Sequence, residues 1–282
     1  MKTFWIRTAS AAVYVLLFLG TLYSGRLTGN ATLGHLLFTA FLLFVAVGCT
    51  YEFFRMVEQQ GARPCRPLGY LYVVGALLML TLPAVLPAGE GFAMMLMAYG
   101  FFPVLFALSV IVELWRSSEQ PFREAAYTMV PLLYAAIPLA LMSSIASDLG
   151  ENALLMVIAL VWINDSGAYI GGSLFGRHKM WPRHSPGKTW EGTAFGVLVA
   201  VLVAVFVGPL LVPDVAWPTW LAVGLVCSVV ATLGDLVESM LKRSVGVKDS
   251  GNIMPGHGGF LDRFDSLLII TPFVYIVLLL LN

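Results

Sequence analysis

Apolar stretches long enough to cross a lipid bilayer recur along this chain of 282 residues. A helix needs about 20 apolar residues to span the hydrocarbon core. Only 11% of the residues are charged, whereas a soluble domain carries about a quarter, so lipid is the expected surrounding. No strand-period pattern competes, and we predict an all-α, polytopic integral membrane protein with nine spans. The predicted spans lie near residues 5–24, 32–54, 68–88, 91–114, 126–147, 152–174, 192–212, 218–241 and 266–281.

The basic residues fall almost entirely on one side of these spans. If the N-terminus is cytoplasmic, every one of the 16 Lys and Arg residues except Arg26 lies in a cytoplasmic segment, as the positive-inside rule requires. One missed or invented span would invert every later loop. The pattern therefore predicts nine spans with the N-terminus in the cytoplasm and the C-terminus on the opposite side. We interpret the first apolar run as a retained helix, because no small-residue cleavage site closes it and more spans follow.

Charge and cysteine content exclude several classes of function. The formal net charge is zero, so no nucleic-acid partner is expected. The cysteines, Cys49, Cys65 and Cys227, form no CxxC pair and have no His at ligand spacing. A zinc site or a disulfide framework is therefore not expected.

The segment 235–265 holds an unusual density of charges of both signs. Carboxylates that bind a divalent cation, beside Lys and Arg that neutralise phosphate, are typical of sites that handle metal and phosphate together. The basic residues alone are equally consistent with a solvated loop beside the membrane, but that alternative leaves the five acids unexplained. The charged residues of this segment are Asp235, Glu238, Lys242, Arg243, Lys248, Asp249, Asp262, Arg263 and Asp265.

Two acids are singled out by their depth inside predicted spans. Asp165 and Asp235 each interrupt an apolar stretch, where an Asp costs about 2.5–3.5 kcal/mol on insertion scales and normally faces a cavity or a partner. Both are placed in the cytoplasmic half, so we expect them to line one polar cavity, although a structural contact between helices is an alternative for each. Asp235, Glu238, Ser239 and Lys242 are spaced i, i+3, i+4 and i+7, which predicts one polar helix face.

Two loops carry further candidates. The segment 248–259 contains four glycines and a proline, a composition that excludes helix and lets backbone N–H groups approach phosphate. His257 there either donates to phosphate or holds the turn. In the loop before the seventh span, Gly187-Lys188-Thr189 imitates the end of a P-loop, but Pro182 stands where that motif needs glycine. Ser185, Lys188 and Thr189 remain as anion-binding candidates at a helix N-terminus.

Together these residues resemble the signature of the phosphatidate cytidylyltransferases, also called CDP-diacylglycerol synthases. The resemblance is carried by the residues 239–243, 248–251 and 255–265, and upstream by 165–169 and 185–192. It covers residues 160–265 and rests only on length and hydropathy over the first 150. We therefore divide the chain into N-terminal transmembrane helices, 1–150, for packing and for lipid or dimer contacts, and a catalytic region, 151–282.

The resemblance implies an enzyme that joins CTP and phosphatidic acid into CDP-diacylglycerol and pyrophosphate. It also implies dependence on Mg²⁺, with or without a second cation, a homodimer, and a bacterial inner membrane with the active site facing the cytoplasm. We assign metal binding to Asp235 and Asp262, with Asp249 and Asp265 as helpers. The candidate catalytic residues are Asp165, Asp235, Glu238, Asp249, Asp262 and Asp265, and the candidate substrate-binding residues are Ser185, Lys188, Thr189, Ser239, Lys242, Arg243, Lys248, His257 and Arg263.

Two rival functions remain open from the sequence. A CTP-dependent lipid kinase would use similar residues but release CDP instead of pyrophosphate. A transporter or channel could use the acids at 165 and 235 as an ion path. A transporter should show duplicated half-helices, however, and every informative motif lies in the C-terminal half.

Overall fold

The computed structural model describes residues 2–182, 185–247, 249–251 and 258–281, so Lys248 and His257 lie outside the described residues. The chain divides into two compact units. The first is Met1–Ser144 with Asp249–Arg263, and the second is Ile145–Lys248 with Phe264–Asn282. The segment from Asp249 to Arg263 thus groups with the N-terminal helices.

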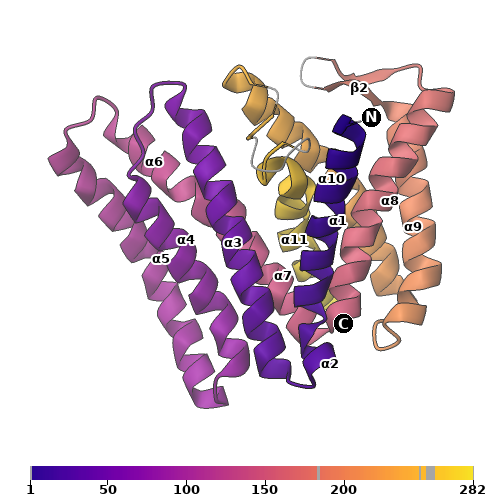
Figure 1. Cartoon of the computed structure of the whole chain (residues 1–282), viewed down its shortest axis with the longest axis horizontal. Coiled ribbons are helices and arrows are strands. Elements are labelled where there is room, and N and C mark those ends of the chain that lie inside the picture. Colours follow the sequence, from indigo (N-terminus) through magenta and orange to yellow (C-terminus); the bar gives the residue numbers. More distant parts are fainter. Residues whose placement is uncertain (1, 183–184, 248, 252–257, 282) are drawn as a thin grey trace. The chain divides into compact units, whose positions relative to one another are not determined.

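The first unit is helical, and its α3, α4 and α5 lie side by side (Figure 1). Short turns join its helices, and α7 continues into the second unit. Its elements are α1 (Lys2–Leu22), α2 (Ser24–Thr28), α3 (Ala31–Glu58), α4 (Arg66–Thr81), η1 (Leu82–Val85), α5 (Ala88–Arg116), α6 (Pro121–Pro131), η2 (Leu132–Ala136) and α7 (Ile137–Asp148).

The second unit packs three long helices against one another and adds a small hairpin (Figure 1). The helix that ends the chain begins in the first unit and runs on into the second. The elements are α8 (Glu151–Phe175), β1 (Lys179–Trp181), β2 (Ser185–Thr189), α9 (Trp190–Leu211), α10 (Trp217–Ser244) and α11 (Leu261–Leu281).

Seven helical segments of the described residues are long and apolar enough to cross a membrane, judged by length and composition. The all-α, polytopic membrane class predicted from the sequence is therefore confirmed in outline. The other two predicted spans coincide with α1, of 21 residues, and α5, of 29 residues. The seven segments are Ala31–Glu58, Arg66–Val85, Pro121–Asp148, Glu151–Phe175, Trp190–Leu211, Trp217–Ser244 and Leu261–Leu281.

One of these spans, Pro121–Asp148, is interrupted by a π-helical turn. The turn, Leu132–Ala136, directly follows Pro131. Proline has no N–H and its ring crowds the preceding turn, so the helix widens locally and then resumes as α7.

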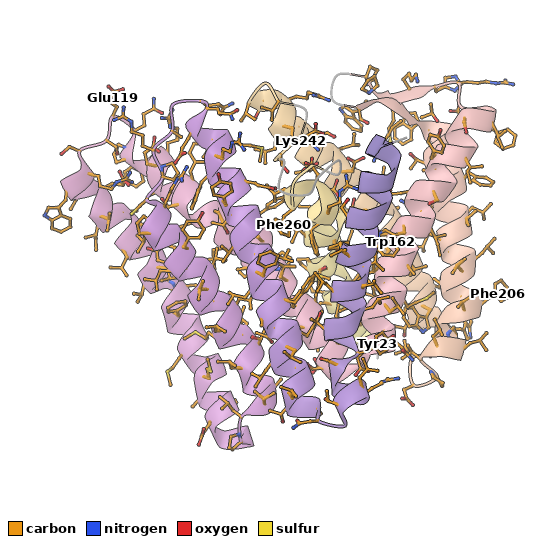
Figure 2. The ribbon with its side chains drawn as sticks, in the orientation of Figure 1. Tyr23, Glu119, Trp162, Phe206, Lys242 and Phe260 are labelled. Carbon is orange, nitrogen blue, oxygen red and sulfur yellow. The ribbon has the colours of Figure 1, made fainter. Side chains whose placement is uncertain are left out.

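Small residues bring α9 close to its neighbours. The buried residues of α9 recur every fourth position, as Gly192, Gly196, Ala200, Ala204 and Gly208. A Cβ on Gly192 would collide with the backbone of α8, so glycine is required where these helices approach. Large apolar side chains occupy the outer face, and Phe206 points away from the helix with 68% of its surface exposed (Figure 2). One small and one bulky face are expected of a membrane helix that packs on one side and meets lipid on the other.

The antiparallel hairpin of β1 and β2 was not expected from the sequence, which predicted a loop there. The strands have three and five residues, which are too few for an alternation of apolar and polar residues to be recognised in the sequence. The hairpin places Thr189 at the N-cap of α9, where its hydroxyl oxygen accepts a hydrogen bond from the Gly192 N–H at 3.2 Å. The residue before it, Lys188, is thereby fixed next to the start of α9.

Candidate functional site

A pocket of about 440 Å³ opens in the second unit among α8, β2, α9 and α10. Asp165 of α8 and Asp235 of α10 both line it, as the sequence predicted for a shared polar cavity. Its walls also include Lys188 and Thr189 of the hairpin. The pocket thus joins two of the sequence motifs that carry the family resemblance, 165–169 and 185–192.

Lys188 is held by two groups of α10. Its Nζ lies 2.6 Å from Asp235 Oδ2 and donates a hydrogen bond to the Thr232 carbonyl oxygen at 3.3 Å. The Lys188 side chain is only 22% exposed, so its charge acts in a partly desolvated place, where electrostatic interactions are stronger than in water. A cation in this position can neutralise a bound phosphate without first being ordered.

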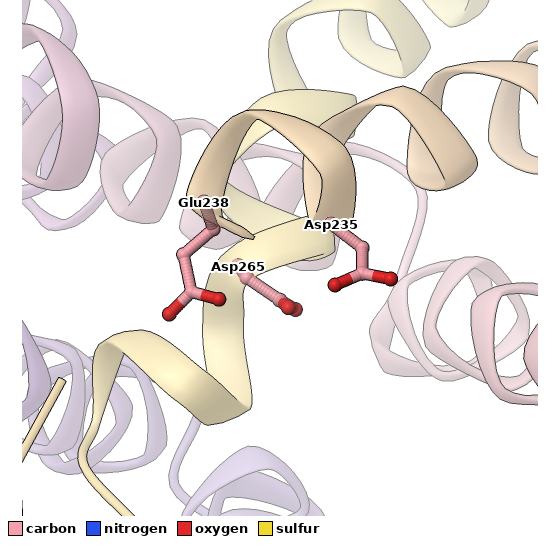
Figure 3. Close-up of side chains that lie close together, drawn as sticks. All are labelled: Asp235, Glu238 and Asp265. Carbon is pink, nitrogen blue, oxygen red and sulfur yellow. The ribbon is translucent and has the colours of Figure 1, made fainter. Parts of the chain in front are cut away.

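Three carboxylates converge beside the pocket (Figure 3). Asp235 and Glu238 project from one face of α10 and Asp265 from the first turns of α11, with one oxygen of each acid within 4.8 Å of the others. Glu238 is fully buried and forms an ion pair with Lys242. Ser239 Oγ lies 3.5 Å from Asp235 Oδ1. The predicted polar face of this helix therefore forms, and in its Glu238–Lys242 pair the Glu238 side chain is fully buried while that of Lys242 is 12% exposed.

The donor set of these three acids fits a hard divalent cation. Carboxylate oxygens are the ligands that Mg²⁺ prefers in proteins. Lys188 forms an ion pair with Asp235, and Lys242 forms one with Glu238. Like charges brought this close repel, and a bound cation would offset that repulsion.

The second acid that we assigned to metal, Asp262, has other neighbours. Its Oδ2 accepts hydrogen bonds from Ser250 N at 2.9 Å, Ser250 Oγ at 2.9 Å and Gly259 N at 2.8 Å. These contacts all lie in the first unit, whereas Asp235, Glu238 and Asp265 belong to the second. Asp265, expected only as a helper, is the acid that clusters with Asp235, and the sharing of a cation by Asp235 and Asp262 stays a prediction.

The remaining candidates occupy simpler positions. Arg243, near the end of α10, is exposed and donates from Nη1 to the Val247 carbonyl oxygen at 3.1 Å. Ser185 begins β2 and is half-buried. Asp249 and Arg263 are exposed residues of the first unit.

The sequence analysis missed Thr232 and Asn164. Thr232 lines the pocket, and its Oγ1 lies 3.4 Å from Nδ2 of the fully buried Asn164 on α8. Thr232 precedes Asp235 by three positions, so it extends the same helix face. That spacing was a signal present in the sequence.

Comparison with known proteins places the chain in a family. A family model described as the cytidylyltransferase family matches residues 5–281. The chain therefore belongs to the cytidylyltransferase family.

The relatives that it resembles carry a more specific name. The phosphatidate cytidylyltransferase of Staphylococcus epidermidis (strain ATCC 35984) is 41% identical over 180 residues, which are 62% of this chain and 68% of that protein. The phosphatidate cytidylyltransferase of Staphylococcus haemolyticus is 42% identical over 160 residues, which are 56% and 60% of the two chains. That of Staphylococcus aureus (strain COL) is 38% identical over 180 residues, or 62% and 68%.

Proposed function

We propose that this protein transfers CMP from CTP to phosphatidic acid, which gives CDP-diacylglycerol and pyrophosphate for phospholipid synthesis. The names of the relatives and the match to the family support this reaction. The observation that carries it is the double placement of Asp235, which pairs with Lys188 in the pocket and also belongs to the three-carboxylate cluster. The groups that we assign to phosphate and to a cation thus lie next to each other among membrane helices, where a lipid with a phosphate head would reach them.

The proposed transfer is an in-line displacement at the α-phosphorus of CTP. A phosphatidate phosphate oxygen forms a new bond to that phosphorus, and the bond to the bridging oxygen breaks and releases pyrophosphate. Reactions of this class depend on positioning and charge neutralisation rather than on covalent side-chain chemistry. Lys188 suits the neutralising role because it is held at the pocket wall.

A divalent cation, which we propose to be Mg²⁺, would be held by Asp235, Glu238 and Asp265, the acids that cluster. When bound, it supplies charge neutralisation to the triphosphate. Lys242 holds Glu238 in place. Arg243, Lys248 and Arg263 would contact the nucleotide phosphates, the pyrophosphate or the lipid phosphate.

The test is a transfer assay with purified protein, CTP labelled at the α-phosphate, phosphatidic acid and Mg²⁺. We expect the label in the lipid phase, one pyrophosphate released per lipid labelled, and loss of the product when EDTA removes the cation. Release of labelled CDP, with no label in the lipid phase, would instead indicate a lipid kinase. Absence of any CTP-dependent product would contradict the proposal.

We also propose nine spans in a bacterial inner membrane, with the N-terminus and the site in the cytoplasm and the C-terminus outside. The distribution of Lys and Arg supports this orientation. The N-terminal helices, 1–150, would serve packing and lipid or dimer contacts, and 151–282 catalysis. The homodimer that the family resemblance implies remains a prediction.

The orientation predicts the location of two reporters. A reporter fused after Asn282 should lie outside the cytoplasm, and one inserted at Pro182 should lie inside it, because three of the proposed spans, an odd number, lie between these two positions. Paired enzymatic reporters that act on opposite sides of the membrane measure this directly. Both reporters on one side would contradict the nine-span topology.

A further inference from the structure

Glu52, a buried glutamate of α3, lies outside every motif discussed so far. It contacts the segment 249–263 of the first unit, which carries part of the family signature and is called the family segment below. Glu52 is fully buried, and its carboxylate accepts hydrogen bonds from three donors of the segment 249–263. Oε1 accepts from Phe260 N at 2.9 Å, and Oε2 accepts from Leu261 N and from Ser250 Oγ, each at 2.9 Å. A buried carboxylate is tolerated only where donors replace the lost water. Here all three donors belong to the same segment.

The Glu52 carboxylate occupies the space that a side chain would need at two glycines of this segment. A Cβ at Gly251 or at Gly259 would collide with a Glu52 oxygen. Neither glycine has a positive φ, so the need for glycine is a matter of space rather than of backbone conformation. The carboxylate is thus enclosed from both ends of the segment.

One face of α3 continues this contact. The Phe44 and Phe260 rings pack edge to face with centroids 5.2 Å apart, and a Cβ on Gly48 would collide with the Phe260 ring. Phe44, Gly48 and Glu52 are spaced four residues apart, so they lie on one side of the helix. On that face the Phe260 ring packs in the space left by Gly48, and the Glu52 carboxylate lies one turn further along the helix.

Asp262 shares the hydrogen-bond partner Ser250 with Glu52. Ser250 Oγ lies 2.9 Å from both Glu52 Oε2 and Asp262 Oδ2. A hydroxyl has one proton, so it donates to one of the two acids at a time. Ser250 N and Gly259 N also donate to Asp262, which ties the beginning and the end of the segment to each other and to α3.

We propose that Glu52 is a positioning residue for the cytidylyl transfer, because it fixes the start of α11 and both ends of the family segment. The proposal rests on the function proposed above. α11 begins at Leu261, directly after Phe260, and donation of the N–H groups of these two residues to a carboxylate stabilises a helix start. Asp265 of the acidic cluster follows Leu261 by about one turn, so the position of the helix start sets that of Asp265.

The alternative is that Glu52 serves packing alone. The positioning role and the packing role predict different effects for a substitution that keeps the size of the side chain. Glu52→Gln keeps the volume and one carbonyl oxygen but turns an NH₂ group toward a backbone N–H. Packing is preserved while the helix start loses an acceptor. Glu113→Gln is the matched control, since Glu113 is also buried in a helix of the first unit but bonds Arg116 and Ser118 instead.

The experiment combines hydrogen exchange with kinetics on the full chain in lipid nanodiscs. In Glu52→Gln we expect the amides of residues 258–263 to exchange about tenfold faster or more, and kcat to fall by about tenfold or more, as for loss of a charge-assisted hydrogen bond. KM for CTP should change little, and the Mg²⁺ concentration for half-maximal rate should rise. Glu113→Gln should match the unmodified protein in all of these.

Ser250→Ala provides a second variant if Glu52→Gln does not fold. It removes one donor shared by the two acids, so the same changes are expected at smaller size. Unchanged exchange in residues 258–263 would contradict the stabilisation of this segment by Glu52. Faster exchange with unchanged kcat would contradict the positioning role of Glu52. Exchange needs no turnover, so failure of the unmodified protein to transfer CMP would count against the proposed function, and not against the contact of Glu52 with this segment.

Discussion

Replacement of Asp235 by Asn should reduce turnover by about 100-fold or more, because several interactions converge on that one carboxylate. Asp235 holds Lys188 at 2.6 Å and shares the cluster with Glu238 and Asp265. Asn keeps the shape but has no charge to attract a cation or an ammonium group. Initial rates measured over a range of Mg²⁺ concentrations should show a lower maximum and a higher Mg²⁺ requirement.

The acids of the cluster should also behave as a unit. Asp265→Asn should resemble Asp235→Asn, and the double variant should be little worse than either, since residues that act together are strongly non-additive. Asp214→Asn is the control, because Asp214 is an exposed acid of the same unit in the turn before α10. If Asp265→Asn kept a normal Mg²⁺ requirement while Asp262→Asn lost it, the original pairing of Asp235 with Asp262 would replace the cluster.

Replacement of Lys188 by Ala should reduce kcat/KM by about 10- to 150-fold, the equivalent of a charge-assisted contact worth about 1.5–3 kcal/mol. The side chain is partly buried and held by Asp235 and by the Thr232 carbonyl, so it is already oriented before a phosphate arrives. Steady-state kinetics with CTP and phosphatidic acid varied in turn will show which substrate depends on it.

Controls for Lys188 come from the same hairpin. Lys179 on β1 is exposed and pairs in register with Thr189, and Lys179→Ala should keep nearly normal kinetics. Lys188→Arg should recover only part of the activity, because a guanidinium does not replace an ammonium at a close point contact. Normal kinetics in Lys188→Ala would leave Lys188 with no role beyond membrane orientation.

The helices were largely predictable from the sequence because their cause is local. A stretch of about 20 apolar residues must satisfy its backbone within itself in lipid, so it forms a helix wherever it stands. The i, i+3, i+4 spacing from Asp235 to Lys242 is likewise a property of one helix. The predicted helices and the polar face of α10 are both found in the structure, with the helix bounds shifted by a few residues.

Glu52 shows where that reasoning was left incomplete. The cost of an ionisable residue in an apolar stretch, which singled out Asp165 and Asp235, applies equally to Glu52 in the stretch 32–54. The sequence therefore contained a signal for this residue. It did not contain the partners, because Phe260 and Leu261 follow Glu52 by more than 200 residues.

The sequence by itself determined the membrane class and the family motifs and indicated the candidate residues for phosphate and cation, because composition and spacing suffice for these. The tertiary structure decided which of them meet. Lys188 reaches Asp235 because glycines at 192 and 196 let α8 and α9 pack closely beside α10. It also grouped Asp265 with Asp235 and Glu238. Such pairings depend on side-chain volume and helix packing between distant parts of the chain, which no local pattern specifies.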